Sequence, residues 1–292
     1  MKAKDPVQPP ASTPDINVQN IADRIKPVAQ STDPWSVLAY GRSGTGKTVF
    51  ASTFPKPLLL LDIGEKGTDS IHNVPGIYVL KVESWIDFET IYWFIRAGKH
   101  EYKTVVLDTV TQLQKLAIEH ALEGDGKEKT SPMNKNLWGI TSKLMTAWLI
   151  NFRDLPLHTV YLAQDRLTSE EGANPDQVAA EVGPRLMPSV AASLNAAVRI
   201  IGNTYIKEYR KTVKTGVEKR FIFRLRIGPH EYYLTKIRKI KEIKLPNSIA
   251  NPSFEKLTEI ISPQVEVSTE ELGAAGAIIF KELKKLEETK PE

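Results

Sequence analysis

The sequence contains no cysteine among its 292 residues. This absence excludes disulfide bonds, zinc sites built on thiolates and a cysteine nucleophile, and it agrees with a reducing compartment. Long apolar runs are also missing, and the longest apolar stretches are far too short to span a bilayer. The N-terminal stretch MKAKDPVQPPASTPD has no apolar core of signal-peptide length. We therefore expect a cytoplasmic protein with no membrane partner.

Acidic residues are scarce in one region of the chain. Residues 207–244 hold thirteen Lys or Arg against four Asp or Glu, although the net charge of the whole chain is only +4. A basic segment on a mildly acidic body favours a polyanionic partner such as nucleic acid. The same pattern is also typical of a solvated strand whose cations block edge pairing, so charge alone leaves both interpretations open.

The composition is otherwise that of a soluble globular protein, with 41% hydrophobic and 25% charged residues. Residues 1–33 are rich in proline and small polar side chains, which predicts a disordered N-terminal arm. We expect an ordered core over residues 34–245. Residues 246–292 then form a C-terminal helical extension, with a helix at 268–288.

Residues 41–48, GRSGTGKT, match the phosphate-binding loop pattern G-x-x-x-x-G-K-[ST] without interruption. The apolar run at 35–40 before it suits a buried strand, and residues 49–53 can continue a helix until Pro55 stops it. Loop amides and the helix N-terminus would hold the phosphates of ATP, Lys47 would reach the β- and γ-phosphates, and the Thr48 hydroxyl would bind Mg²⁺. The residues expected to hold the nucleotide are Gly41, Arg42, Ser43, Gly44, Thr45, Gly46, Lys47 and Thr48.

Strand and helix patterns alternate after this loop. Buried strands are predicted at 57–62, 77–82, 104–108 and 158–163, and helices at 84–97, 111–122 and 137–152. A long polar loop at 165–188 precedes an antiparallel meander at 198–206, 220–227 and 231–237. The prediction is an α/β fold, with a mainly parallel sheet covered by helices on both faces and an antiparallel basic extension. The aromatic residues of the helix at 84–97 are expected in the core; they are Trp85, Tyr92, Trp93 and Phe94.

Polar residues at strand ends carry the candidate chemistry. Asp108 closes the strand TVVLD and is expected to hold Mg²⁺ with Thr48, although such an Asp can also cap the next helix. Glu65 and Asp62 follow the second strand, and either could activate water or serve as a loop acid. Gln164 ends the strand HTVYLA, where it could sense the γ-phosphate or only close the hydrogen bonding of the strand.

Three segments together, GRSGTGKT, TVVLDTVTQL and HTVYLAQ, resemble the RecA-type recombinase ATPase core. The stretches EYKTVVLDTVTQL and NLWGITSKLMTAWLINFRDLPLHTVYLAQ are most similar to phage-type, single-core RecA-like ATPases of single-strand annealing and recombination. The resemblance covers about Pro34 to Ile243. It differs in one place, because the family often has D-x-E where this chain has Asp62-Ile63-Gly64-Glu65.

The resemblance implies a head-to-tail homo-oligomer, a ring or a filament, with ATP at subunit interfaces. A cation from the neighbouring subunit would complete each site, and Lys236 and Arg238 match that element, although both can also be plain strand-edge cations. Two loops, at 123–135 and 165–188, would face single-stranded DNA. The second loop holds Arg166 and Arg185 but no aromatic residue, so DNA contact there would depend on phosphate charge.

These observations predict a cytoplasmic ATPase of a bacterial or phage-infected cell that binds single-stranded DNA and acts in recombination or strand annealing. A single-strand-binding protein is a further expected partner. Three alternatives stay open on the sequence: a ring-shaped helicase or translocase, a non-hydrolysing scaffold whose assembly nucleotide controls, and a small-molecule kinase.

Overall fold

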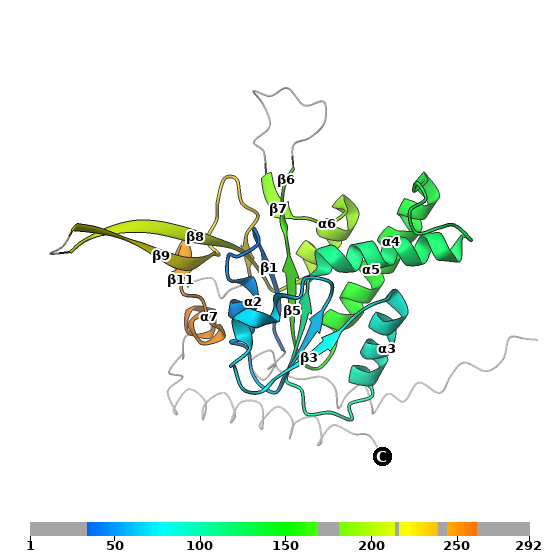
Figure 1. Cartoon of the computed structure of the whole chain (residues 1–292), viewed down its shortest axis with the longest axis horizontal. Coiled ribbons are helices and arrows are strands. Elements are labelled where there is room, and N and C mark those ends of the chain that lie inside the picture. The colour runs from blue at the N-terminus through cyan, green and yellow to red at the C-terminus, as the bar shows by residue number, and fades with distance from the viewer. Residues whose placement is uncertain (1–33, 169–180, 214–215, 239–243, 262–292) are drawn as a thin grey trace, which may run out of the picture. The chain divides into compact units, whose positions relative to one another are not determined.

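The computed structural model describes residues 34–168, 181–213, 216–238 and 244–261 (Figure 1). The predicted arm at 1–33 and the predicted helix at 268–288 lie outside these residues. None of the helices in the described ranges has the length and apolar character needed to cross a membrane.

A nine-stranded sheet forms the centre of the described core, in the order β11-β9-β8-β1-β5-β4-β2-β3, with β10 also paired to β8. The strands from β8 to β3 run parallel to their neighbours, whereas β9, β10 and β11 pair antiparallel. The strand bounds are β1 Ser36–Tyr40, β2 Leu58–Asp62, β3 Ile77–Lys81, β4 Thr104–Asp108, β5 His158–Ala163, β8 Ile200–Val213, β9 Gly216–Arg226, β10 Lys236–Ile237 and β11 Ser248–Ala250. This arrangement confirms the predicted mainly parallel α/β fold with an antiparallel extension.

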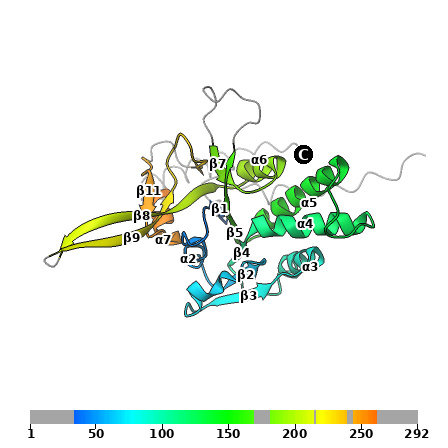
Figure 2. The same cartoon turned by 45° about the horizontal axis from the view of Figure 1, so that its top comes forward.

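Helices cover both faces of the sheet, because the central strands are apolar on both sides (Figure 2). One core contains residues of α3, α4, α5 and α6, and the other contains residues of α2, η2 and α7. The helix bounds are α2 Lys47–Ala51, the 3₁₀ helix η2 Gly67–Ile71, α3 Trp85–Arg96, α4 Val110–Gly124, α5 Lys135–Arg153, α6 Pro188–Ala197 and α7 Phe254–Ile261.

Helix α3 begins as its sequence predicts but buries only part of its aromatic set. The Ser84 hydroxyl accepts from the Asp87 amide while the Asp87 carboxylate accepts from the Ser84 amide, which is a complete capping box. Trp85 and Tyr92 are buried, as expected, whereas Trp93 and Phe94 are 59% and 50% exposed. The expectation of a core position is wrong for these two, because they follow Tyr92 directly and therefore turn away from the face that it buries.

The second half of the chain differs most from the predicted pattern. Two short strands, β6 Asp165–Thr168 and β7 Glu181–Pro184, pair within the predicted loop at 165–188, and α6 follows them. The predicted strands at 198–206 and 220–227 extend into one hairpin, of which β8 and β9 are the two sides. Strand β11 and helix α7 join the sheet and the second core, so the expected boundary near residue 245 does not separate them from the core.

Candidate phosphate-binding site

The phosphate loop lies between β1 and α2, at the carboxyl end of the central strand. Gly46 has a φ of 82°, in the left-handed region that favours glycine, and a Cβ there would lie 3.0 Å from the Phe223 ring. A Cβ at Gly41 would collide with the backbone and hydroxyl of Thr204. Two glycines of the pattern are therefore required by the close approach of β8 and β9 as well as by the curl of the loop.

Lys47 is buried within the loop that precedes it. Its Nζ donates to the carbonyl oxygens of Gly41 and Arg42, at 2.9 Å each, so its ammonium lies across the mouth of the loop. Burial lowers the pKa of Lys47, and the nearby carboxylates of Asp108 and Glu65 act in the opposite direction. The charged oxygens of a triphosphate would accept stronger hydrogen bonds from this ammonium than the two neutral carbonyl oxygens do.

Thr48 and Asp108 form a hydrogen-bonded pair beside the phosphate loop. The Thr48 hydroxyl donates to Asp108 Oδ2 at 2.8 Å, which joins the loop to the end of β4. Thr109, not Asp108, caps α4, because the Thr109 hydroxyl accepts from the Gln112 amide. The capping alternative for Asp108 is therefore wrong.

Asp108 is 4% exposed, and burial raises its pKa to about 6, against the opposing effects of Thr48 and Lys47. A hydroxyl beside a carboxylate fits Mg²⁺, which takes one or two protein oxygens and completes its shell with phosphate oxygens and water. Within the described residues no cluster of three acidic or histidine side chains offers a metal site of its own. Thr48 and Asp108 would hold the ion, which when bound supplies charge neutralisation at the phosphates.

Glu65 is the centre of a polar cluster contributed by three elements. Its Oε1 accepts from Gln164 Nε2 at 2.8 Å, from Gln112 Nε2 at 3.3 Å and from the Thr109 hydroxyl at 3.3 Å. Glu65 follows β2, Gln164 directly follows β5, and the other two residues lie at the start of α4. Since β5 lies between β1 and β4, this cluster stands beside the phosphate loop and Asp108.

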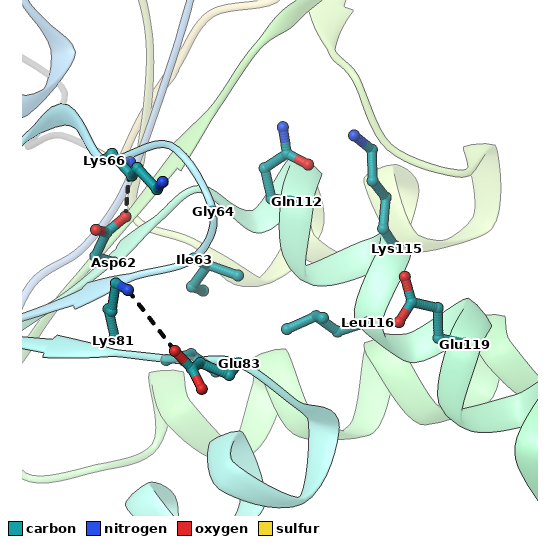
Figure 3. Close-up of a pocket in the computed structure, with 11 residues that line it drawn as sticks. Asp62, Ile63, Gly64, Lys66, Lys81, Glu83, Gln112, Lys115, Leu116 and Glu119 are labelled. Carbon is teal, nitrogen blue, oxygen red and sulfur yellow. Dashed lines mark hydrogen bonds and ion pairs between the residues drawn. The ribbon is translucent and has the colours of Figure 1, made fainter. Parts of the chain in front are cut away.

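Asp62 occupies a different position from Glu65, although the sequence offers both as water activators. Its Oδ1 accepts from the backbone amide of Lys66 at 3.0 Å, which closes the turn that carries Glu65 (Figure 3). Asp62 is also the register partner of Asp108 across β2 and β4. Asp62 therefore holds the turn that carries Glu65, while Glu65 contacts Gln164 and Gln112.

A pocket of about 330 Å³ lies behind this turn, between the ends of β2 and β3 and helix α4 (Figure 3). Gln112 lines it and also contacts Glu65, so the pocket adjoins the polar cluster. Lys81 and Glu83 form an ion pair at 3.7 Å on its rim.

The remaining predicted residues lie elsewhere. Lys236 Nζ donates to the carbonyls of Asn195 and Ala196 at 2.6 and 2.8 Å, and Arg238 Nη2 donates to that of Ala196 at 2.7 Å. Both cations thus satisfy the C-terminal carbonyls of α6 in their own chain. Arg166 and Arg185 are exposed on and beside the β6–β7 hairpin, and the Arg185 amide donates to the Gln164 carbonyl at 2.7 Å.

Several site contacts have no signal in the sequence. Gln112 and Thr109 were not predicted to contact Glu65, and the Thr45 and Thr204 hydroxyls, which share a hydrogen bond of 2.7 Å, are 159 residues apart. Only the strand order brings these pairs together. The position of Gln112 near the start of a helix that follows the strand-end Asp is the single local hint.

Comparison with known proteins gives one result. Residues 33–238, more than two thirds of the chain, match the model of a family described as an AAA domain. The comparison with curated proteins found no match.

Proposed function

Since this chain belongs to the AAA domain family, whose members are P-loop ATPases, we propose that it hydrolyses ATP while bound to single-stranded DNA, in recombination or strand annealing. The observation that carries the hydrolytic part is the 2.8 Å contact between Gln164 and Glu65, next to the Thr48–Asp108 pair. An acid held by an amide beside the phosphate loop is the arrangement that water activation requires.

The site divides the work among its residues. The loop amides and Lys47 hold the phosphates, and Thr48 and Asp108 hold the metal ion when it is bound. Glu65 orients the attacking water and accepts its proton. The hydrogen bonds from Gln164 and Gln112 to Glu65 Oε1 fix the direction of the carboxylate.

Gln164 links the site to the β6–β7 hairpin. Its side chain contacts Glu65, while its carbonyl accepts from the Arg185 amide and Asp165 begins β6 directly after it. A shift of the Gln164 side chain on loss of the γ-phosphate would therefore move the β6–β7 hairpin. This supports the proposal that Arg166 and Arg185 contact DNA in a nucleotide-dependent way.

The proposal includes assembly into a ring or filament, with Lys236 or Arg238 acting on the ATP of the neighbouring subunit and a single-strand-binding protein as a further partner. What supports assembly is the resemblance to RecA-type ATPases. The trans role requires these bonds to break first: Lys236 would have to leave the carbonyls of Asn195 and Ala196, and Arg238 that of Ala196.

ATP turnover, measured with and without single-stranded DNA and paired with the mass of the assembly, tests this function. Wild-type protein should turn over ATP faster with DNA, and Lys47→Ala should abolish turnover while the surface variant Lys99→Ala keeps it. Stimulation by a metabolite instead of DNA would favour a kinase. DNA unwinding would favour a helicase, and annealing that survives Lys47→Ala would favour a scaffold.

A further inference from the structure

Strands β8 and β9 leave the sheet as a two-stranded ribbon (Figure 1). Strand β8 pairs with β1 only up to Asn203, and β9 pairs with β11 only from Arg224 to Arg226. Beyond these residues the two strands pair with each other alone. The ribbon, defined here as residues 205–213 and 216–223, therefore projects from the sheet with no third strand among those described paired along its edges.

One face of the ribbon is aromatic. Cross-strand pairing places Ile206 opposite Phe223, and Glu208 opposite Phe221, with side chains on the same face. Phe221 is 62% exposed and Phe223 is 43% exposed. Phe223 lies beside Gly46 and still keeps this exposure, and exposed apolar side chains gathered on one face mark interaction sites.

Two basic side chains lie on the same face as the rings. Arg210 and Lys219 are opposite each other on the same face, farther along the ribbon, and both are exposed. The single carboxylate of this face, Glu208, forms an ion pair with Lys219 at 3.3 Å, and an exposed pair of this kind is weak enough for a phosphate to replace it. The surface thus combines aromatic rings with excess positive charge.

The spacing of the rings selects the ligand. Residues two apart on a strand lie about 6.8 Å apart. Since stacked bases are about 3.4 Å apart, one base fits between Phe221 and Phe223 with a ring on each side. In duplex DNA the base faces are already stacked, so these rings suit a single strand.

We propose that the Phe221–Phe223 face of the ribbon binds single-stranded nucleic acid, with bases stacked on the two rings and phosphates held by Arg210 and Lys219. This inference rests on the nucleic-acid partner of the proposed function, and it names a surface separate from Arg166 and Arg185. Here sequence preference would be weak, because every base has a face that can stack.

Binding of a fluorescent oligodeoxythymidylate to the full-length protein tests the proposal. Phe221→Ala should weaken binding by roughly five- to 100-fold, while Phe94→Ala, which removes another half-exposed phenyl on α3, should leave it unchanged. An abasic deoxyribose-phosphate polymer of the same length separates stacking from charge. Phe221→Ala should not affect the binding of this polymer. Arg210→Ala should weaken the binding of both the polymer and the oligonucleotide, whereas the control variant Lys99→Ala should weaken neither.

Failure of the ribbon and failure of the proposed function give different results. If wild-type protein binds the oligonucleotide and Phe221→Ala binds it equally well, the ribbon assignment is wrong and the DNA partner stands. Stacking would also be refuted if Phe221→Ala weakened the binding of the abasic polymer or of duplex DNA as much as the binding of the oligonucleotide. If the variant changed the mass of the assembly without changing DNA affinity, this face would be a protein interface instead. No binding by wild type would refute the DNA partner itself, whatever the ATP turnover.

Discussion

Asp108→Asn is expected to make the protein more stable while it removes hydrolysis. Asp108 is buried, and burial raises its pKa from 3.8 to about 6. The charged form is therefore disfavoured in the folded state relative to the unfolded chain. At a pH above both values the charge costs the folded protein about 3 kcal/mol.

The sign of the pH dependence follows from proton uptake. Between the two pKa values the folded protein binds more protons than the unfolded chain, so the stability of the wild type falls as pH rises. Asparagine is neutral throughout. The stability of Asp108→Asn relative to wild type should therefore increase by about 2 kcal/mol between about pH 4.5 and pH 8, since part of the full effect has already developed at the lower pH.

Urea unfolding of both proteins, without nucleotide or metal, at these two pH values measures the effect. Groups that do not interact with Asp108 contribute equally to both proteins and cancel in the difference. Asparagine can still accept from Thr48, so the hydrogen bond between them need not be lost. A difference that does not change with pH would refute the argument that burial raises this pKa, and normal ATP turnover by the variant would refute the metal assignment.

The remaining predictions concern Glu65, Lys236 and the contact with DNA. Glu65→Gln should keep nucleotide affinity and lose at least about 100-fold in turnover, because the proton acceptor is gone; turnover within a few fold of wild type would remove Glu65 from this role. Lys236→Ala should lower the free energy of unfolding by about 1 kcal/mol through loss of its bonds to the end of α6. If Lys236 also acts across subunits, its variant should lose turnover in assemblies yet regain part of it when mixed with Lys47→Ala; no recovery would limit it to the helix end. DNA affinity should fall steeply from low to physiological salt in titrations, and a flat response would contradict phosphate contact.

The sequence predicted the parts of the site that are local. Strand, glycine loop and helix are adjacent in the chain, so the positions of Lys47 and Thr48 followed from one motif. The partnership of Thr48 with Asp108 followed from the strand-end rule. The contact of Glu65 with Gln164 joins residues 99 apart and depends on β2 and β5 lying on either side of β4, which hydrophobic periodicity does not specify.

The missed elements have weak local signals. Helix α6 has no side chain that caps its N-terminus and is built largely of small residues, so it resembled the end of a loop. Without α6, the contacts of Lys236 and Arg238 could not be foreseen. The β8–β9 ribbon is rich in charge, and its side chains at 206–210 and 219–221 are exposed, whereas strand prediction depends on apolar alternation.

The root of the ribbon has a consequence for the energetics of the protein. Phe223 lies against Gly46, and the Thr204 hydroxyl is hydrogen-bonded to that of Thr45. The base of the ribbon is therefore in direct contact with the phosphate loop. A triphosphate that alters the loop would thereby alter the affinity of the ribbon for its ligand. Linkage then demands that occupancy of the ribbon change the dissociation constant of the triphosphate by the same factor, with no relay through distant residues.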